Sequence, residues 1–145
     1  MAIYWDTSCL LKLYCPEPDS EEYLQRIEAA DEPPVSSNLL ASEIVFALYQ
    51  KALREELKMW DADRLIQRFH GDVEKGRLIL LPLGSDVHFE AVRIGKICFT
   101  RSKPIPLRTL DGLHLATASL ASCREIVTAD ERMRDASKVL GFKLG

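Results

Sequence analysis

Short apolar runs alternate with amphipathic helical patterns along this chain, and this alternation constrains its fold more than any other feature. Apolar runs of strand length occupy residues 2–5, 35–36, 77–81, 125–128 and 142–144. Helical patterns fill the segments between them, at 9–14, 19–30, 38–57, 61–75, 85–100, 109–122 and 131–140. Such alternation predicts an α/β fold, a three-layer sandwich with a mainly parallel central sheet of about five strands covered by helices on both faces.

The chain has the size and composition of one ordinary domain, which we expect to span residues 1–145. It is 145 residues long, and 47% of these are hydrophobic, typical of a globular protein. No apolar run reaches the length of a membrane span, and the first residues lack the basic start of a secretory signal. The four cysteines form no C-x-x-C pair, which favours reduced thiols in a cytoplasmic protein.

Two aspartates follow strand-like runs directly. Asp6 comes after the run at 2–5, and Asp130 comes after the run that begins at Glu125. In open α/β sheets, ligands bind beyond the carboxyl ends of the strands. We therefore expect both carboxylates at the functional edge of the sheet.

Two further acids interrupt the apolar faces of helical patterns. At 100° per residue, Glu43 shares the face of Leu40 and Ile44, and Asp111 lies within about 40° of Leu115. Both acids stand near the start of their helices, where free N–H groups favour anions. A buried carboxylate without a partner is costly, so each of the two requires one.

Each acid also has a purely structural explanation. Asp6 and Asp130 are suitable N-caps, Asp111 suits a first helical turn, and Glu43 fits an exposed helix face. These explanations do not account for four acids that approach one edge. Like charges gathered in one crevice repel each other, and a hard divalent cation such as Mg²⁺ or Mn²⁺ relieves that repulsion. The set therefore predicts metal-assisted phosphoryl chemistry.

Several polar residues stand close to these acids in the sequence. Ser8 and Thr128 flank the strand-end aspartates, where a hydroxyl either orients a carboxylate or simply caps a helix. His114 follows Asp111 by three positions and shares its face, but the pattern favours a packed, hydrogen-bonded histidine over a role beside the acids. No P-loop, G-x-G-x-x-G or Ser-His-Asp pattern occurs.

The net charge of −3 does not indicate a nucleic-acid-binding protein, although cations bound to the four acids would change this balance. Contacts to a nucleic acid would then fall to local basic residues. The candidates are Lys12, Arg101, Lys103, Arg108, Arg132 and Arg134, of which we select Lys12 and Arg108. The plain alternative for each is a solvated surface residue.

Taken together, the motifs resemble those of the PIN-domain ribonucleases, and among these the VapC-type toxins of toxin–antitoxin pairs. The resemblance spans nearly the whole chain. The matching stretches are 3–8 (IYWDTS), 11–14 (LKLY) with Glu17, 42–44 (SEI), 109–118 (TLDGLHLATA) and 128–130 (TAD).

The resemblance implies a PIN-like fold and assigns roles to the acids. It implies that Asp6, Glu43, Asp111 and Asp130 are both the catalytic and the metal-binding residues. From their positions beside the strand-end aspartates, we expect Ser8 and Thr128 to be supporting residues. It further implies Mg²⁺ or Mn²⁺ as cofactor, RNA as substrate, hydrolysis that leaves a 5′-phosphate, a homodimer, and a small antitoxin as inhibitor.

Other functions remain open at this point. The closest are a PIN-fold nuclease that processes RNA outside toxin–antitoxin systems, and a non-catalytic PIN-fold binding module. An acidic metallophosphatase is a third. A phospho-accepting receiver domain fits poorly, because Asp6 has no acidic neighbour and Lys143 lies inside the last strand.

Overall fold

A five-stranded sheet in the order β3-β2-β1-β4-β5 forms the centre of the computed structural model, which describes residues 2–145. The strands are β1 (Ile3–Trp5), β2 (Val35–Ser37), β3 (Ile79–Leu81), β4 (Glu125–Val127) and β5 (Lys143–Leu144). The helices are α1 (Thr7–Tyr14), α2 (Ser20–Ala29), α3 (Leu39–Leu53), α4 (Met59–Glu74), α5 (Ser85–Phe99), α6 (Thr109–Leu120) and α7 (Glu131–Leu140). All four strand pairings are parallel, which confirms the expected α/β class.

The strand register places the first and fourth strands side by side at the centre of the sheet. Tyr4 of β1 pairs with Val35 on one side and with Ile126 on the other. Beyond the last pair, the backbone N–H of Asp6 donates to the carbonyl oxygen of Val127 at 3.1 Å. The carboxyl ends of β1 and β4, which carry the strand-end aspartates, are therefore neighbours.

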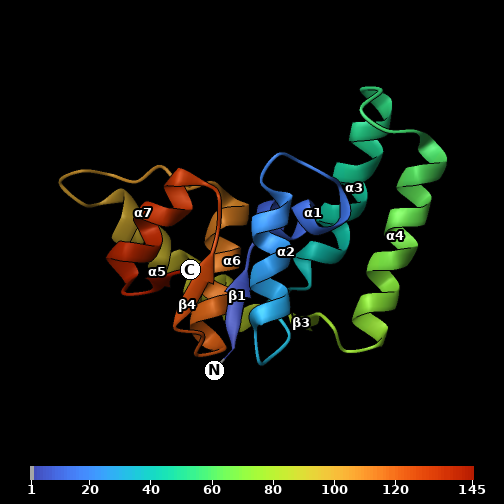
Figure 1. Cartoon of the computed structure of the whole chain (residues 1–145). Coiled ribbons are helices and arrows are strands. Elements are labelled where there is room, and N and C mark those ends of the chain that lie inside the picture. The colour runs from blue at the N-terminus through green and yellow to red at the C-terminus, as the bar shows by residue number, and fades with distance from the viewer. Residues whose placement is uncertain (1) are drawn as a thin grey trace.

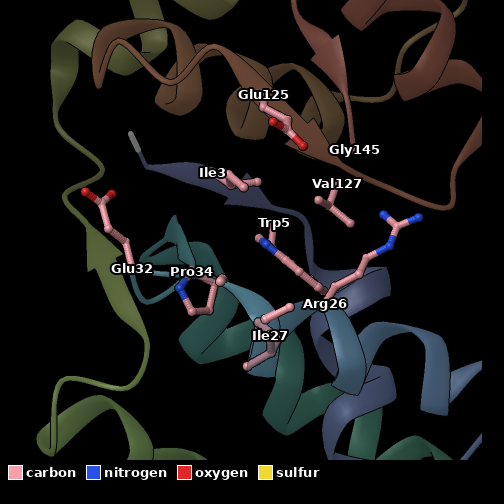
Figure 2. Close-up of a pocket in the computed structure, with 11 residues that line it drawn as sticks. Ile3, Trp5, Arg26, Ile27, Glu32, Pro34, Glu125, Val127 and Gly145 are labelled. Carbon is pink, nitrogen blue, oxygen red and sulfur yellow. The ribbon is translucent and has the colours of Figure 1, made fainter.

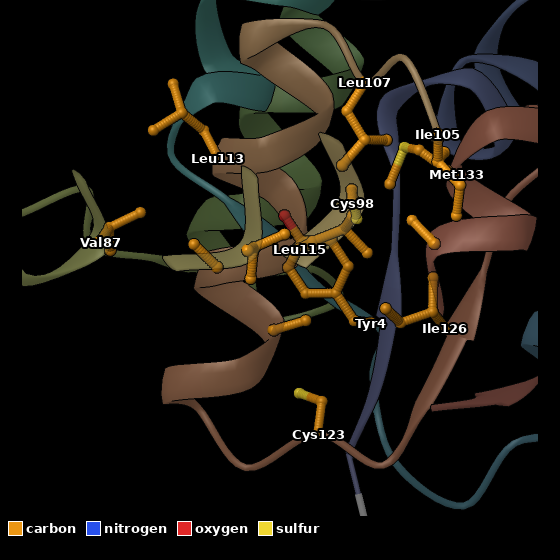
Figure 3. Packing of buried hydrophobic residues seen from close by; sticks show 14 of the residues in the cluster. Tyr4, Val87, Cys98, Ile105, Leu107, Leu113, Leu115, Cys123, Ile126 and Met133 are labelled. Atoms are coloured by element: carbon orange, nitrogen blue, oxygen red, sulfur yellow. The ribbon is translucent and has the colours of Figure 1, made fainter. Parts of the chain in front are cut away.

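Helices cover both faces of the sheet, with α5, α6 and α7 on one face and α1 to α4 on the other (Figure 1). Successive residues of a strand point to opposite faces, so Tyr4 joins one core and Trp5 the other. The α5–α7 core surrounds Tyr4, Leu115 and Ile126, which are fully buried (Figure 3). Trp5 and Val127 pack into the core with α1 to α4. These layers confirm the three-layer sandwich.

Several element boundaries differ from the predicted ones. The first helix begins at Thr7 rather than at 9, because the side chain of Asp6 caps it. The third helix ends at Leu53 rather than at 57, since Glu55 adopts a left-handed conformation (φ 61°) that ends a helix. The third strand is shorter than predicted and begins at Ile79. Within residues 2–145, no helix is long and apolar enough to cross a membrane.

Candidate active site

The four predicted acids line one pocket of about 230 Å³. The lining residues are Asp6, Thr7, Ser8, Glu43, Arg108, Asp111, His114, Asp130 and Met133. They come from the end of β1 and from α1, α3, α6 and α7 with their flanking residues. The structure thus brings together residues that lie more than a hundred positions apart. It also adds Thr7, Met133 and His114 to the residues that the sequence placed at this site.

Asp6 is the most deeply buried of the four acids, with only 4% of its surface exposed. Its carboxylate accepts hydrogen bonds from the Ser8 hydroxyl at 2.7 Å, from the backbone N–H of Cys9 at 3.2 Å and from the Thr128 hydroxyl. Burial raises the pKa of the Asp6 carboxyl, and the three donors offset only part of that shift. Asp6 is therefore the N-cap of α1, and burial disfavours the ionised form of its carboxyl group.

Arg108 lies between the other two aspartates at the mouth of the pocket. Its guanidinium group is 3.7 Å from Asp111 and 3.6 Å from Asp130, and its backbone N–H donates to Asp111 at 3.1 Å. Asp130 also caps α7 by accepting from the backbone N–H of Met133 at 2.9 Å. Because the Arg108 side chain is 66% exposed, these ion pairs contribute little to stability. They show that the pocket attracts positive charge.

Glu43 is held by two donors from other elements. Its Oε1 accepts a hydrogen bond from the Thr7 hydroxyl at 2.9 Å and lies 2.7 Å from Nε2 of His114. His114 is 3% exposed, and its Nδ1 lies 2.6 Å from the Tyr4 hydroxyl. The histidine is buried and hydrogen-bonded, as the sequence favours, but its partner is one of the acids. In the sequence, the signal for this contact between His114 and an acid of the site was the position of His114, three residues after Asp111 and on the same helix face.

Two predicted residues lie outside the lining of the pocket. Thr128 is 3% exposed and acts through its hydrogen bond to Asp6. The ammonium group of Lys12 instead pairs with Asp19 at 2.7 Å and with Glu17 at 3.3 Å. An RNA contact by Lys12 stays a prediction, and the structure shows that this lysine already has two acidic partners.

The donor chemistry of the pocket suits a hard divalent cation, but the side chains are not gathered around one point. Carboxylate oxygens are the preferred protein ligands of Mg²⁺ and Mn²⁺. Within the described residues, no group of three or more His, Cys, Asp or Glu side chains is arranged to hold a metal ion. Binding of one ion directly by three or more of these acids would therefore require some of their side chains to move, and the ion would compete with Arg108 for Asp111 and Asp130.

A larger hollow, of about 370 Å³, lies between α2 and the sheet (Figure 2). Ile3, Trp5 and Val127 of the strands and Ile27 of α2 give it a mostly apolar lining, and Arg26 is among its charged residues. It contains none of the four predicted acids. The smaller acidic pocket is therefore the candidate active site.

The sequence matches the family model of the PIN domain over residues 3–139. A relative, "Ribonuclease VapC46" of Mycobacterium tuberculosis, is 34% identical over 146 aligned positions, which cover 97% of this chain and 94% of that protein. Both matches extend over almost the whole chain, and the range matched by the family model includes the positions of all four acids of the pocket.

Solved structures share the fold at lower sequence identity. VapBC2 from Rickettsia felis, bound to a promoter DNA fragment, has a TM-score of 0.70 and 14% identity, covering 100% of this chain and 98% of that one. The sarcin–ricin loop cleaving toxin VapC20 of Mycobacterium tuberculosis has a TM-score of 0.67 and 12% identity, with coverages of 92% and 94%. At such identities the likeness establishes the fold alone.

Proposed function

The chain belongs to the PIN-domain family, and we propose that it is a divalent-metal-dependent endoribonuclease, the toxin of a toxin–antitoxin pair. The observation that most supports this proposal is that four acids line one pocket: Asp6, Glu43, Asp111 and Asp130. The 34% identity to a ribonuclease over nearly the full length supports RNA as the substrate. An RNA-processing nuclease with the same fold is the alternative biological role.

Asp6, Asp111 and Asp130 would hold Mg²⁺ or Mn²⁺, with Glu43 completing the set. When bound, the cation supplies a water of lowered pKa and neutralises the charge that builds on the phosphate oxygens. A bound cation would also favour the ionised form of the Asp6 carboxyl, whose pKa is raised by burial.

The remaining side chains orient these acids and the substrate. The hydroxyls of Ser8 and Thr128 hold the carboxylate of Asp6 in one orientation. Glu43, whose Oε1 is hydrogen-bonded to Thr7 and His114, would either complete the metal-binding set or orient the attacking water. If Asp111 and Asp130 held a cation, the exposed guanidinium of Arg108, which now pairs with both, would be available to contact an RNA phosphate at the mouth of the pocket.

A protein partner is part of the proposal, because large apolar side chains are exposed on several helices. Phe46 and Leu53 of α3 are 68% and 75% exposed, and Phe89 of α5 is 76% exposed. Exposed apolar patches are typical of protein–protein contact sites. They support the expected antitoxin and homodimer, and the cytoplasmic location expected from the thiols fits such partners.

The test is cleavage of RNA by the purified protein, with Mg²⁺, with Mn²⁺ and with a chelator. We expect cleavage only with a divalent cation, products with 5′-phosphates, and loss of cleavage in Asp111→Asn. Co-expression with the neighbouring reading frame should suppress growth inhibition if that frame encodes the antitoxin. Cation binding without cleavage of any cellular RNA would favour a non-catalytic binding module instead.

Arg108→Gln should bind Mg²⁺ more tightly than the wild type does. Removing a cation from beside Asp111 and Asp130 strengthens Mg²⁺ binding about three- to tenfold, the effect expected for one partly screened charge. Calorimetry with Mg²⁺ alone measures this effect. The control is Arg101→Gln, which changes an exposed arginine outside the pocket. Equal Mg²⁺ affinities of the wild type and Arg108→Gln would show that the guanidinium does not compete with the ion.

A further inference from the structure

Four side chains from four separate elements form a continuous hydrogen-bonded chain that ends at the acidic pocket. The hydroxyl of Tyr4 in β1 lies 2.6 Å from Nδ1 of His114 in α6. The opposite ring nitrogen, Nε2, lies 2.7 Å from Oε1 of Glu43 in α3. Thr7 of α1 donates to the same Oε1 at 2.9 Å and lies 3.3 Å from Nε2. The chain therefore connects the centre of the core to one acid of the site.

The protons of this chain have one consistent arrangement. Oε1 of Glu43 is a carboxylate oxygen and accepts hydrogen bonds, so Nε2 of His114, 2.7 Å away, is the ring nitrogen that carries a proton. The hydroxyl of the fully buried Tyr4 lies 2.6 Å from the other ring nitrogen, Nδ1. In a neutral ring Nδ1 is then the acceptor, and the Tyr4 hydroxyl donates to it. The Nε2–H group in turn donates to Glu43.

In this arrangement the two carboxylate oxygens of Glu43 differ in their hydrogen bonds. Oε1 receives two donors, from Thr7 and from His114. Oε2 has no hydrogen bond to any residue from 2 to 145. The carboxylate is thus fixed at one oxygen, and the other is left for a ligand in the pocket that Glu43 lines.

We propose that Tyr4 and His114 are positioning residues: Tyr4 sets the Nε2–H tautomer of His114, and His114 fixes Glu43 so that Oε2 faces the cation or the attacking water. The proposal rests on the nuclease function proposed above and extends it to two residues that do not contact substrate. Second-sphere partners of this kind commonly alter metal affinity or activity by about 10- to 100-fold.

Two substitutions of His114 separate positioning from simple packing. The amide nitrogen of glutamine reaches approximately the place of Nε2, whereas that of asparagine reaches only the place of Nδ1. His114→Gln can therefore still donate to Glu43, and His114→Asn cannot. Glutamine also fills more of the volume of the buried ring than asparagine does, so a packing role predicts losses of activity that follow the losses of thermal stability, whereas positioning predicts a loss of activity in His114→Asn beyond its loss of stability.

We expect His114→Asn to lower kcat for RNA cleavage about 10- to 100-fold and to weaken Mg²⁺ binding, with little change in KM. His114→Gln should recover most of both losses. Tyr4→Phe should lower kcat by a smaller factor, because it removes the tautomer constraint but leaves the Nε2 contact possible. Thermal unfolding of each variant, followed in the presence of a chelator, checks that the chain remains folded. Equal losses in the Asn and Gln variants would overturn the proposal.

The wild-type protein supplies a test that needs no variant of His114. In ¹⁵N-histidine NMR spectra of the metal-free protein, His114 should show the neutral Nε2–H tautomer, and Glu43→Gln should shift its Nε2 resonance. An Nδ1–H tautomer would overturn the proposal even if the protein cleaves RNA. A wild type that binds no Mg²⁺ and leaves RNA intact would instead overturn the nuclease function, so the two failures are distinguishable.

Discussion

Replacing Asp6 with asparagine is expected to lower the rate of RNA cleavage by about 1,000-fold or more, equivalent to about 4 kcal/mol of transition-state stabilisation. The substitution removes a charge at nearly constant volume from the most buried acid of the pocket. The amide oxygen can still accept from Ser8 and Cys9, so the cap of α1 persists. Initial rates with saturating Mg²⁺ measure the effect.

Without metal, the same variant should gain stability relative to the wild type as the pH rises. Because burial raises the pKa of the Asp6 carboxyl, its contribution to stability is fully present below its unfolded pKa. That contribution is lost as the pH rises through the raised folded pKa. Asp6→Asn has no such titration, so in chelator its stability relative to the wild type should increase with pH over the range above about pH 4, the ordinary pKa of an aspartate. Parallel melting curves for the two proteins across that range would contradict this expectation.

The control for both measurements is Asp135→Asn, on the exposed side of α7. It removes an equal charge from the same region without touching the pocket. We expect wild-type cleavage and a wild-type dependence of stability on pH. Added Mg²⁺ should raise the melting temperature of the wild type and of this control, but not that of Asp6→Asn.

Replacing Ile126 with alanine is expected to lower the free energy of unfolding by about 2–5 kcal/mol. Ile126 is fully buried in β4, where it pairs with Tyr4 of the neighbouring strand and packs in the α5–α7 core. Truncation leaves a cavity that the surrounding close-packed layers cannot fill. Urea unfolding in the presence of chelator measures the loss.

Ile79→Ala is the matched control, because Ile79 also lies in a strand but is 42% exposed. Its truncation should cost less than half as much as that of Ile126. Equal losses at the two positions would show that the α5–α7 core does not carry the stability assigned to it.

The order of strands and helices, and the position of the acids at one edge of the sheet, could be predicted from the sequence. Asp6 and Asp130 follow apolar runs directly, and parallel strands bring their carboxyl ends to a common edge. The helical periodicity of the sequence then predicts that Glu43 and Asp111 point toward the same edge of the sheet. These arguments require only the position and direction of each strand and helix, which the local hydrophobic pattern predicts well.

The contacts among the side chains could not be predicted in the same way. The bond between Tyr4 and His114 joins residues 110 positions apart, and it depends on the rotation of α6 and on both rotamers. The bridge that Arg108 makes between Asp111 and Asp130 depends on the path of an exposed loop. Secondary-structure propensity and hydrophobic periodicity contain no information about either of these two side-chain contacts. The same limit explains why Lys12 looked available from sequence although it pairs with two acids.

The central position of β1, between β2 and β4, has a consequence during synthesis. Asp6 is synthesised before Thr128, yet its carboxylate accepts a hydrogen bond from the hydroxyl of Thr128, 122 residues later. A translation product that stops before Thr128 and Asp130 therefore lacks two side chains that the acidic pocket and its buried carboxylate depend on. In this architecture the pocket assembles only after β4 and the residues that follow it have been synthesised.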